Sequence, residues 1–254
     1  MITTKSAREI ALMKIAAEAV MDVHETLRQA LRNGVSTLEL DELAGEIFAK
    51  HDCISGSKGY YGYPGNICIS VNDTLIHGIP SSKIILHDGD IVSLDVVAGY
   101  KGYYADATRT FAVGGKTTER AQRLMDVTKQ SFFEAVKLIK PGVRLGDICA
   151  AIQKYNEDHG YSLAREYTGH GIGKHMHEDP AVPNYGKPGT GPILEEGMCL
   201  AIEPMVLEGK KETRTLGDGW TVKSRDGKLT CHYENTIVVT SDGCEIITMR
   251  KGEQ

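Results

Sequence analysis

Residues 90–113 read DIVSLDVVAGYKGYYADATRTFAV, and this stretch predicts the β-hairpin around which the fold is organised. Two runs rich in β-branched and aromatic residues flank residues 99–102, Gly-Tyr-Lys-Gly, a connection typical of a hairpin. Asp95 and Asp106 are equally far from the centre of that turn, between its Tyr and its Lys. A symmetric hairpin therefore places the two carboxylates directly opposite each other, with Cβ atoms roughly 4.5–5.5 Å apart.

Strand periodicity gives this hairpin one polar and one apolar face. The polar face carries the two aspartates together with Ser93, Tyr104 and Thr108. The apolar face carries Val92, Leu94, Val96 and Phe111. Facing like charges on such a strand pair are destabilising unless a cation lies between them, and one or two divalent metal ions are the simplest choice. The alternative is one exposed aspartate and one aspartate in a loop.

The composition of the 254 residues, 41% hydrophobic and 25% charged, is that of a globular protein with a sizeable core. The net charge of −5 argues against nucleic-acid binding. Six cysteines without a Cys-x-x-Cys pair indicate reduced thiols and a cytoplasmic location. The sequence has neither a signal peptide pattern nor an apolar run of about 18 residues, so we expect no contact with a membrane.

Local patterns predict an α+β protein. Capping boxes at Ser6-x-x-Glu9 and Ser36-x-x-Glu39 predict helices that end near residues 32 and 50. Two more helices are expected at residues 118–139 and 145–159. Strands are expected at residues 163–168, 198–203, 221–224, 229–240 and 245–249, with a hairpin turn at residues 225–227.

A faint internal repeat relates two halves of the chain. Gly34-Val35 recurs 108 residues later as Gly142-Val143, and the interval from Leu86 to Asp95 recurs from Leu194 to Glu203. We therefore expect a single catalytic domain, residues 1–254, made of pseudo-repeat halves at about 1–114 and 115–254. The halves would share an antiparallel sheet with helices on one face, and a pseudo-two-fold axis would place Asp95 and Glu203 face to face.

Three more side chains extend the candidate metal site. Glu203 and Glu234 lie in apolar, strand-like runs, where an unpaired charge is costly, although an ion pair with Arg or Lys is the alternative for each. His170 lies among three glycines, which would let the backbone approach a ligand closely. One His, two Asp and two Glu suit two first-row divalent ions, Mn²⁺, Fe²⁺, Co²⁺ or Zn²⁺, better than a structural zinc site.

These residues lie in a set of motifs that together are highly specific. They are Tyr-Gly-Tyr-Pro at 61–64, His-Gly-Ile-Pro at 77–80, the two hairpin aspartates, Gly-His-Gly-Ile-Gly at 169–173, His-Glu-x-Pro at 177–180, Ile-Glu-Pro at 202–204 and Glu-Asn-Thr at 234–236. The sequence resembles the type I methionine aminopeptidases, which have the pita-bread fold, over essentially its whole length. This resemblance implies a dinuclear metal centre held by Asp95, Asp106, His170, Glu203 and Glu234, with Asp106 and Glu234 bridging the ions.

The resemblance also implies removal of an initiator methionine by a hydroxide that bridges the two ions. His177 and His77 would contact the substrate on the carbonyl side and the amide side, and Glu203 would transfer a proton. A methionine pocket would be lined by Tyr60, Tyr63, Cys68, His77 and Trp220, although strand packing is the alternative for the two tyrosines. Tyr61, Ser57 and Met176 depart from the usual pattern around this pocket, and no role is assigned to His175.

Other readings of the motifs remain open. An X-Pro aminopeptidase or prolidase would carry a large N-terminal domain, whereas 94 residues precede Asp95. A type II methionine aminopeptidase would need an insertion between Glu203 and Glu234, and a binding protein on this fold would have lost ligands. We expect a cytoplasmic monomer that acts on peptides and nascent proteins beginning with Met. Any docking on the ribosome would use the domain surface, because no N-terminal extension is expected.

Overall fold

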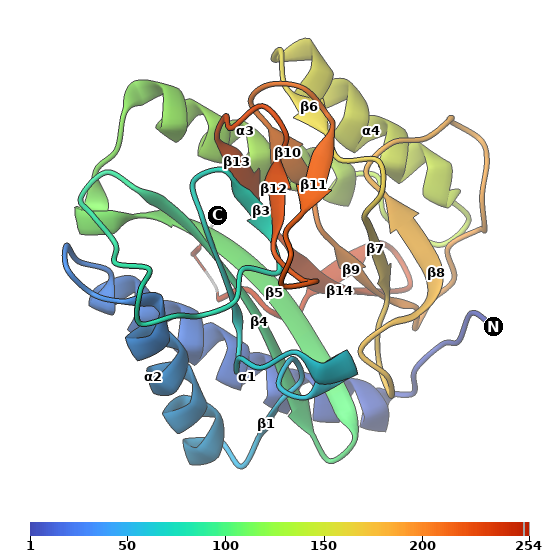
Figure 1. The fold of residues 1–254 in the computed structure, drawn as a ribbon. Helices are drawn as coiled ribbons and strands as arrows, with labels where there is room; N and C mark the ends of the chain where they lie inside the picture. The colour runs from blue at the N-terminus through green and yellow to red at the C-terminus, as the bar shows by residue number, and fades with distance from the viewer. Residues whose placement is uncertain (251, 254) are drawn as a thin grey trace.

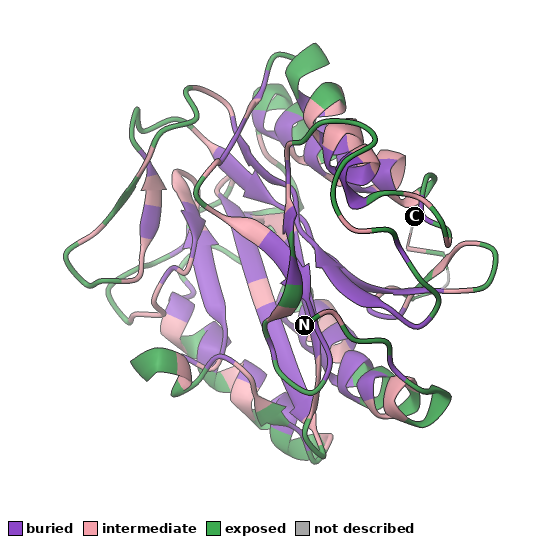
Figure 2. Ribbon diagram, turned by 90° about the vertical axis from the view of Figure 1, so that its right-hand side faces the viewer, coloured by how far each residue is buried: buried purple, intermediate pink, exposed green. Residues whose placement is uncertain are grey.

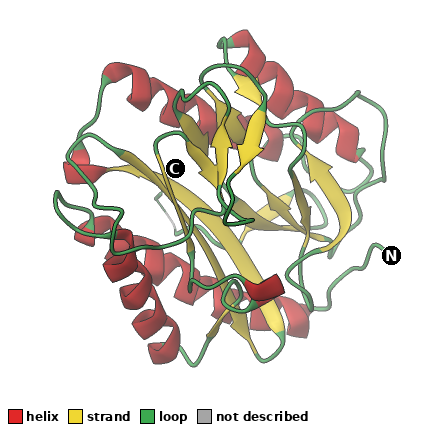
Figure 3. Ribbon diagram, viewed as in Figure 1, coloured by secondary structure: helices red, strands yellow, loops and turns green. Residues whose placement is uncertain are grey.

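The computed structural model describes residues 1–250 and 252–253, and in it the helices lie outside the strands (Figures 1 and 3). The helices are α1 (Ala7–Ala30), α2 (Thr37–Lys50), α3 (Glu119–Val136) and α4 (Leu145–Asp158), with short 3₁₀ turns at η1 (Tyr60–Gly62) and η2 (Val113–Gly115). The strands are β1 (Ile54–Ser55), β2 (Cys68–Val71), β3 (Thr74–Ile76), β4 (Ile91–Tyr100), β5 (Tyr103–Ala112), β6 (Ser162–Leu163), β7 (Thr168–Gly171), β8 (Glu178–Pro183), β9 (Cys199–Ile202), β10 (Met205–Leu207), β11 (Thr213–Thr215), β12 (Val222–Ser224), β13 (Thr230–His232), β14 (Asn235–Val239) and β15 (Cys244–Ile246). The expected α+β class is confirmed.

The helix boundaries follow the local chemistry of the chain. The predicted capping boxes begin α1 and α2, where Ser6 and Ser36 accept from the backbone of Glu9 and Glu39. Helix α3 ends at Val136, before the predicted residue 139, because the amides of Leu138 and Ile139 donate three residues back instead of four. This tightening closes the helix ahead of a Pro-Gly pair.

The central hairpin forms, but its predicted register is wrong. The two-residue turn is Lys101-Gly102, with φ of 47° and 81°, and not Tyr100-Lys101. A primed turn needs positive φ at both positions, and glycine accepts the second without strain. Asp95 therefore pairs with Thr108, and Asp106 pairs with Val97. The shift moves partners by two residues, so the aspartates stay on one face as diagonal neighbours.

The described residues form four sheets, and all strand pairing in them is antiparallel. The two halves therefore do not form one continuous sheet, although β3 of the first half pairs with β12 of the second. The sheets are β4 with β1, β2 and β5; β13-β10-β6; β11-β12-β3; and β15-β14-β9-β7-β8. Backbone hydrogen bonds in both directions between Thr108 and Glu234 join β5 to the second half. The predicted hairpin at residues 225–227 is wrong, because β12 and β13 belong to different sheets.

Two large hydrophobic cores and a third, smaller one among the described residues support these strands, and most of the strand residues are buried (Figure 2). The predicted apolar face of β4, with Val92, Leu94 and Val96, packs against α1 in a core to which α2 also contributes. The second core lies against α3 and α4 and includes Phe132 and Ile237. Among the described residues, no helix is both long and apolar enough to cross a membrane.

Equivalent backbone hydrogen bonds recur in the two halves at the spacing of the sequence repeat. Gly34 N donates to Leu86 O at 2.8 Å, and Gly142 N donates to Leu194 O at 2.9 Å. The reverse bonds also match, from Leu86 N to Val35 O and from Leu194 N to Val143 O, both at 2.8 Å. These pairs support our proposal that the chain is a single catalytic domain built from halves at about residues 1–114 and 115–254.

Arg109 joins the hairpin to the second half from within the core. Its side chain, 5% exposed, donates to the carbonyls of Glu234 and Thr248, to Asn235 Oδ1 and to Glu253 Oε1. These bonds cross between segments that are more than 100 residues apart in the sequence. The guanidinium is therefore expected to hold β5 and β14 together behind the polar face of the hairpin.

We predict that Arg109→Met lowers the free energy of unfolding by about 3–5 kcal/mol, because several buried acceptors lose their donor at once. Urea unfolding followed by circular dichroism measures the change. Arg28, which pairs with Glu25 on the surface of α1, is the matched control. Arg28→Met should cost less than about 1 kcal/mol. Equal costs for the two variants would show that the buried network does not join the halves.

Candidate metal centre

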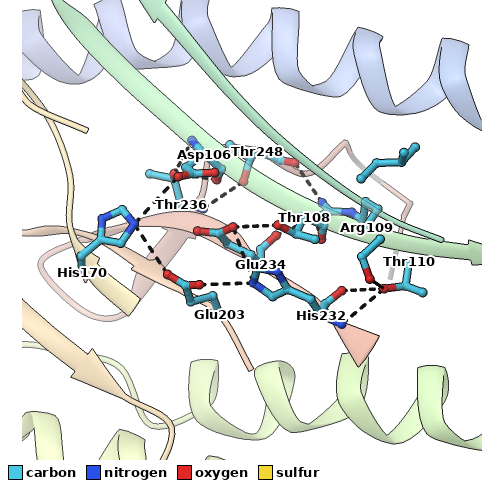
Figure 4. A network of polar contacts seen from close by, with 12 residues as sticks. Asp106, Thr108, Arg109, Thr110, His170, Glu203, His232, Glu234, Thr236 and Thr248 are labelled. Atoms are coloured by element: carbon cyan, nitrogen blue, oxygen red, sulfur yellow. Dashed lines mark hydrogen bonds and ion pairs between the residues drawn. The ribbon is translucent and has the colours of Figure 1, made fainter. Parts of the chain in front are cut away.

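Five candidate ligands come together where the two halves meet. Asp95 lies on β4, Asp106 on β5 and His170 on β7, while Glu203 and Glu234 follow β9 and β13. All five line one cavity of about 170 Å³. Figure 4 shows four of them, Asp106, His170, Glu203 and Glu234, pointing toward one another from separate strands.

The two glutamates sit at matching breaks between strands. Glu203 lies between β9 and β10, and Glu234 lies between β13 and β14. Strand β9 pairs with β14 while β10 pairs with β13, so both strands pass from one sheet to another at the same level. This crossing explains why two residues far apart in the sequence become neighbours. The predicted single strand at residues 229–240 is therefore two strands.

Two groups of side chains bring imidazole and carboxylate atoms close enough together to bind a common metal ion. One group is Asp106, His170 and Glu234, and the other is Glu203, His232 and Glu234; within each, the ligand atoms lie within 4.8 Å of one another. His170 Nε2 is 3.8 Å from Asp106 Oδ2 and 3.6 Å from Glu203 Oε1. Glu234 belongs to both groups. Asp95 lies outside these two groups but faces the same cavity.

The cluster carries more negative charge than its surroundings neutralise. Burial raises the pKa of Asp106, Glu203 and Glu234 well above their usual values, and the neighbouring carboxylates, Glu234, Asp95 and Glu203 respectively, raise them further. Within the described residues, their ion pairs are with histidines and not with Arg or Lys. Arg109 binds the backbone carbonyl of Glu234, not its carboxylate.

Unpaired ligand atoms show that the site fits a cation. Asp106 Oδ1 and Glu234 Oε1 are buried and have no hydrogen-bond partner in residues 1–250 and 252–253. Burial lowers the pKa of His170 to about 3, so its ring is neutral, and its Nδ1 contacts Gly171 O at 2.9 Å. That contact leaves Nε2 free to bind a metal ion. Divalent cations would satisfy these atoms together, as hydrogen bonds from the protein do not.

Neighbouring groups hold the ligands in place. Thr108 Oγ1 donates to Glu234 Oε2 at 2.9 Å, and Thr236 Oγ1 bonds both the amide and the carbonyl of Asp106. The glycines beside His170 also have a role in packing. A Cβ on Gly169 or Gly171 would collide with backbone atoms of neighbouring strands, so these glycines let the strands pack closely.

The predicted substrate residues line the same cavity. Tyr60, Tyr63, Cys68, His77, His177 and Trp220 all contact it, as do Ser57, Tyr61 and Met176. The hydroxyl of Tyr60 lies 2.9 Å from His177 Nδ1, and Tyr63 and His77 each meet the Trp220 ring edge to face. His175 is exposed and does not line the cavity; its amide donates to Glu178 Oε1.

His232 is a member of the cluster that the sequence analysis did not assign. It is 2% exposed, and its Nε2 lies 3.3 Å from Glu203 Oε2 and 3.9 Å from Glu234 Oε2. Burial lowers its pKa to about 4. The available signal was its position two residues before Glu234, which on extended chain places both side chains on one side.

Fold and site are those of a metallopeptidase. A sequence model of metallopeptidase family M24 matches residues 11–241. The methionine aminopeptidase of Clostridium acetobutylicum is 49% identical over 98% of this chain and 99% of its own length, and that of Escherichia coli K12 is 44% identical over 99% and 96%. This chain belongs to metallopeptidase family M24, among its methionine aminopeptidases.

Solved structures agree with this placement and confirm the pita-bread fold. The crystal structure of a methionine aminopeptidase from Thermotoga maritima has a TM-score of 0.96, with 44% identity over 98% of this chain and all of that one. A prolidase from Pyrococcus furiosus has a TM-score of 0.78 at 22% identity, and the match covers 66% of its length. The prolidase therefore shares the fold.

Proposed function

We propose that this protein is a metal-dependent aminopeptidase that removes the initiator methionine from proteins and peptides. The observation that carries the proposal is the convergence of buried carboxylate oxygens, unpaired among the described residues, on a small cavity that aromatic side chains also line. Family membership defines the peptidase chemistry. The small volume, about 170 Å³, is suited to one side chain and is well below the roughly 300 Å³ at which drug-sized pockets begin.

We propose that Asp95, Asp106, His170, Glu203 and Glu234 hold two divalent ions, Co²⁺, Mn²⁺, Fe²⁺ or Zn²⁺. Glu234 belongs to both close groups of ligand atoms, which supports its role as a bridge, and Asp106 lies beside it. Bound ions would supply Lewis-acid activation of the scissile carbonyl and of water. The five protein ligands mix one imidazole with four carboxylates, a donor set that suits these metals.

The protein side chains would then orient the substrate and move protons. Glu203 faces the cavity and His170 through Oε1, where it can accept and return a proton. Tyr60 fixes one nitrogen of His177, so the other nitrogen can donate to the substrate carbonyl. Burial lowers the pKa of His77 to about 4, so this ring is a neutral donor for the amide side of the scissile bond.

The methionine side chain would occupy the space among Tyr60, Tyr63, Cys68, His77 and Trp220. Tyr63 donates to Gly78 O at 2.8 Å, which turns its hydroxyl away from the pocket and leaves the ring as an apolar wall. Burial raises the pKa of Cys68 well above that of a free thiol, so it stays neutral. Neutral sulfur and aromatic rings are favourable contacts for a thioether.

The test is release of the first residue from Met-Gly-type and X-Pro-type peptides, with and without a chelator. We predict release of methionine from Met-Gly peptides only, a loss of at least about a hundredfold on metal removal, and recovery when Mn²⁺ or Co²⁺ is returned. Preferential cleavage of X-Pro peptides over Met-Gly peptides would indicate that the protein is an X-Pro aminopeptidase or prolidase. Full activity after chelation would overturn the metal centre.

We further propose that the protein acts as a cytoplasmic monomer on nascent chains, with any ribosome contact made by the domain surface. All six cysteines are free, as expected in a reducing compartment. Five of them are buried, and burial raises the pKa of Cys149, Cys199 and Cys231 to about 11, 12 and 11. Sedimentation of the purified protein tests the monomer.

A further inference from the structure

His232 lies deeper in the cluster than any role in the proposed reaction requires. Its ring sits between Glu203 and Glu234 (Figure 4), and neither ring nitrogen has a hydrogen-bond partner among the described residues. The ring of His170 differs, because its Nδ1 contacts Gly171 O. A buried imidazole without partners is costly, so its place beside two carboxylates calls for an explanation.

The backbone of His232 is held firmly from the hairpin. Thr110 Oγ1 donates to His232 O at 2.7 Å and accepts from His232 N at 3.4 Å. The Thr110 hydroxyl is itself 2.8 Å from the hydroxyl of Ser93 on β4. Strand β13 is also paired with β10, where His232 opposes Met205. The ring therefore projects from a fixed point toward Glu203.

The surroundings of the ring select its tautomer. A proton on Nδ1, in either the neutral or the cationic ring, would leave a buried N–H with no acceptor. A proton on Nε2 faces Glu203 Oε2 at 3.3 Å and leaves only a lone pair unsatisfied on Nδ1. Buried N–H groups without an acceptor are rarer in proteins than buried acceptors without a donor. Catalytic hydrogen bonds are often imperfectly aligned before ligand binds, as this one is.

We propose that His232 is a positioning residue for Glu203, which it holds by donating from Nε2–H to Oε2. This inference rests on the proposed function of Glu203. The bond would assign the two oxygens of the carboxylate separate tasks, because Oε1 faces His170 and the metal site while Oε2 faces His232. Glu203 could then exchange a proton without rotating away from the substrate.

The rival role is that of a second imidazole ligand, since His232 Nε2 also lies within 4.8 Å of ligand atoms of Glu203 and Glu234. Histidines that bind metal almost always donate from their other nitrogen to a neighbouring acceptor. His170 Nδ1 has such an acceptor, and His232 Nδ1 has none in the part of the chain that the structure describes. The observed contacts therefore favour the donor role.

The two variants His232→Ala and His232→Gln test the proposal by activity. The alanine variant should lose about 10–100-fold in kcat with KM changed less than about threefold. Glutamine offers an amide N–H on a neutral side chain, so it should restore kcat to within about threefold of the wild type. An unchanged kcat in the alanine variant, or no rescue by glutamine, would overturn the proposal.

Nitrogen-15 NMR of Zn²⁺-loaded wild-type enzyme with labelled histidine rings gives a second measurement that does not depend on activity. The spectrum of the glutamine variant identifies His232 among the nine histidines. A proton attached to His232 Nε2 supports the donor role, whereas a metal-shifted Nε2 without a proton overturns it. Wild-type enzyme that binds no metal and releases no methionine would instead refute the proposed function.

His24 provides a matched control for the loss of a buried imidazole. It is 6% exposed, and its Nε2 contacts Leu94 O at 2.9 Å on the apolar side of β4. His24→Gln should lower the melting temperature without changing kcat by more than about twofold. A kcat loss equal to that of His232→Ala would assign the effect to general loosening of the hairpin and would overturn the positioning role.

Discussion

Replacing Glu203 by glutamine should lower kcat for methionine release by about a thousandfold, the middle of the range for losing a general acid–base group. The substitution keeps the size of the side chain, its carbonyl oxygen and its place between His170 and His232. The amide cannot accept a proton as the carboxylate does, and it carries no negative charge. The measurement is steady-state kinetics on a Met-Gly peptide.

Metal content must be measured beside activity, because Glu203 is also a proposed ligand. If the variant binds as many ions per chain as the wild type, the lost kcat belongs to proton transfer. Glu208→Gln is the matched control, since Glu208 is a half-buried glutamate that pairs with Arg120 at 2.8 Å. Its kcat should stay near that of the wild type. Wild-type kcat in a fully metal-loaded Glu203→Gln enzyme would contradict the proton-transfer role.

The features that depend on neighbouring residues in the chain were predictable from the sequence. Capping boxes at Ser6 and Ser36 place the starts of α1 and α2, because the donors and acceptors lie within three residues of each other. The two faces of the hairpin follow from strand alternation, and Val92 and Leu94 are buried as predicted. The alternation of buried and polar residues was therefore predicted correctly even though the register of the hairpin was not.

The predicted register of the hairpin is wrong because Gly-Tyr-Lys-Gly offers two possible positions for a two-residue turn. Symmetry about Tyr100 and Lys101 aligned the aspartates, whereas turn chemistry puts Lys101 and Gly102 at positive φ. Glycine at the second turn position outweighs the symmetric arrangement. An error of one residue in the turn changes every pair by two, and this leaves the choice of face intact.

Some residues of the site could be predicted from the sequence. The strand pairing that brings them together, and the membership of His232, could not. A charged carboxylate in an apolar run is energetically costly, and this pointed to Glu203 and Glu234. The two residues meet because β9 and β14 pair with each other in one sheet. His232 enters the cluster because β13 lies beside β10, a pairing between distant segments that no local pattern contains. Sequence spacing alone could place His232 beside Glu234 and could not bring Glu203 to it.

Metal should stabilise this protein more at high pH than at low pH, because the carboxylates of the empty site favour the folded state less as pH rises. In the metal-free state, burial raises the pKa of Asp106, Glu203 and Glu234 above their values in the unfolded chain, and neighbouring carboxylates raise them further. Between the unfolded and folded values the folded protein binds more protons, so its stability is greatest below the unfolded pKa and is lost as pH rises through the folded pKa.

Bound cations replace those protons, so the metal-loaded enzyme should not lose stability in this way. The difference in melting temperature between loaded and metal-free protein should therefore widen by roughly 5–10 °C from pH 5 to pH 8. Differential scanning calorimetry at constant ionic strength measures it. Buried histidines act in this window with the opposite sign, because the lowered pKa values of His24 and His77, about 3 and 4, cost stability below pH 6.5. They do so with and without metal, so the difference between the two forms isolates the carboxylates.

Glu234→Gln separates this linkage from a general effect of metal on rigidity. The neutral amide removes one buried charge, so the metal-free variant should melt higher than metal-free wild type at pH 8 and close to it at pH 5. The same variant should bind metal more weakly, because Glu234 is shared by both groups of ligand atoms. Parallel melting curves for loaded and metal-free protein across this pH range would mean that the carboxylates are already neutralised without metal, and the electrostatic basis of the site would be wrong.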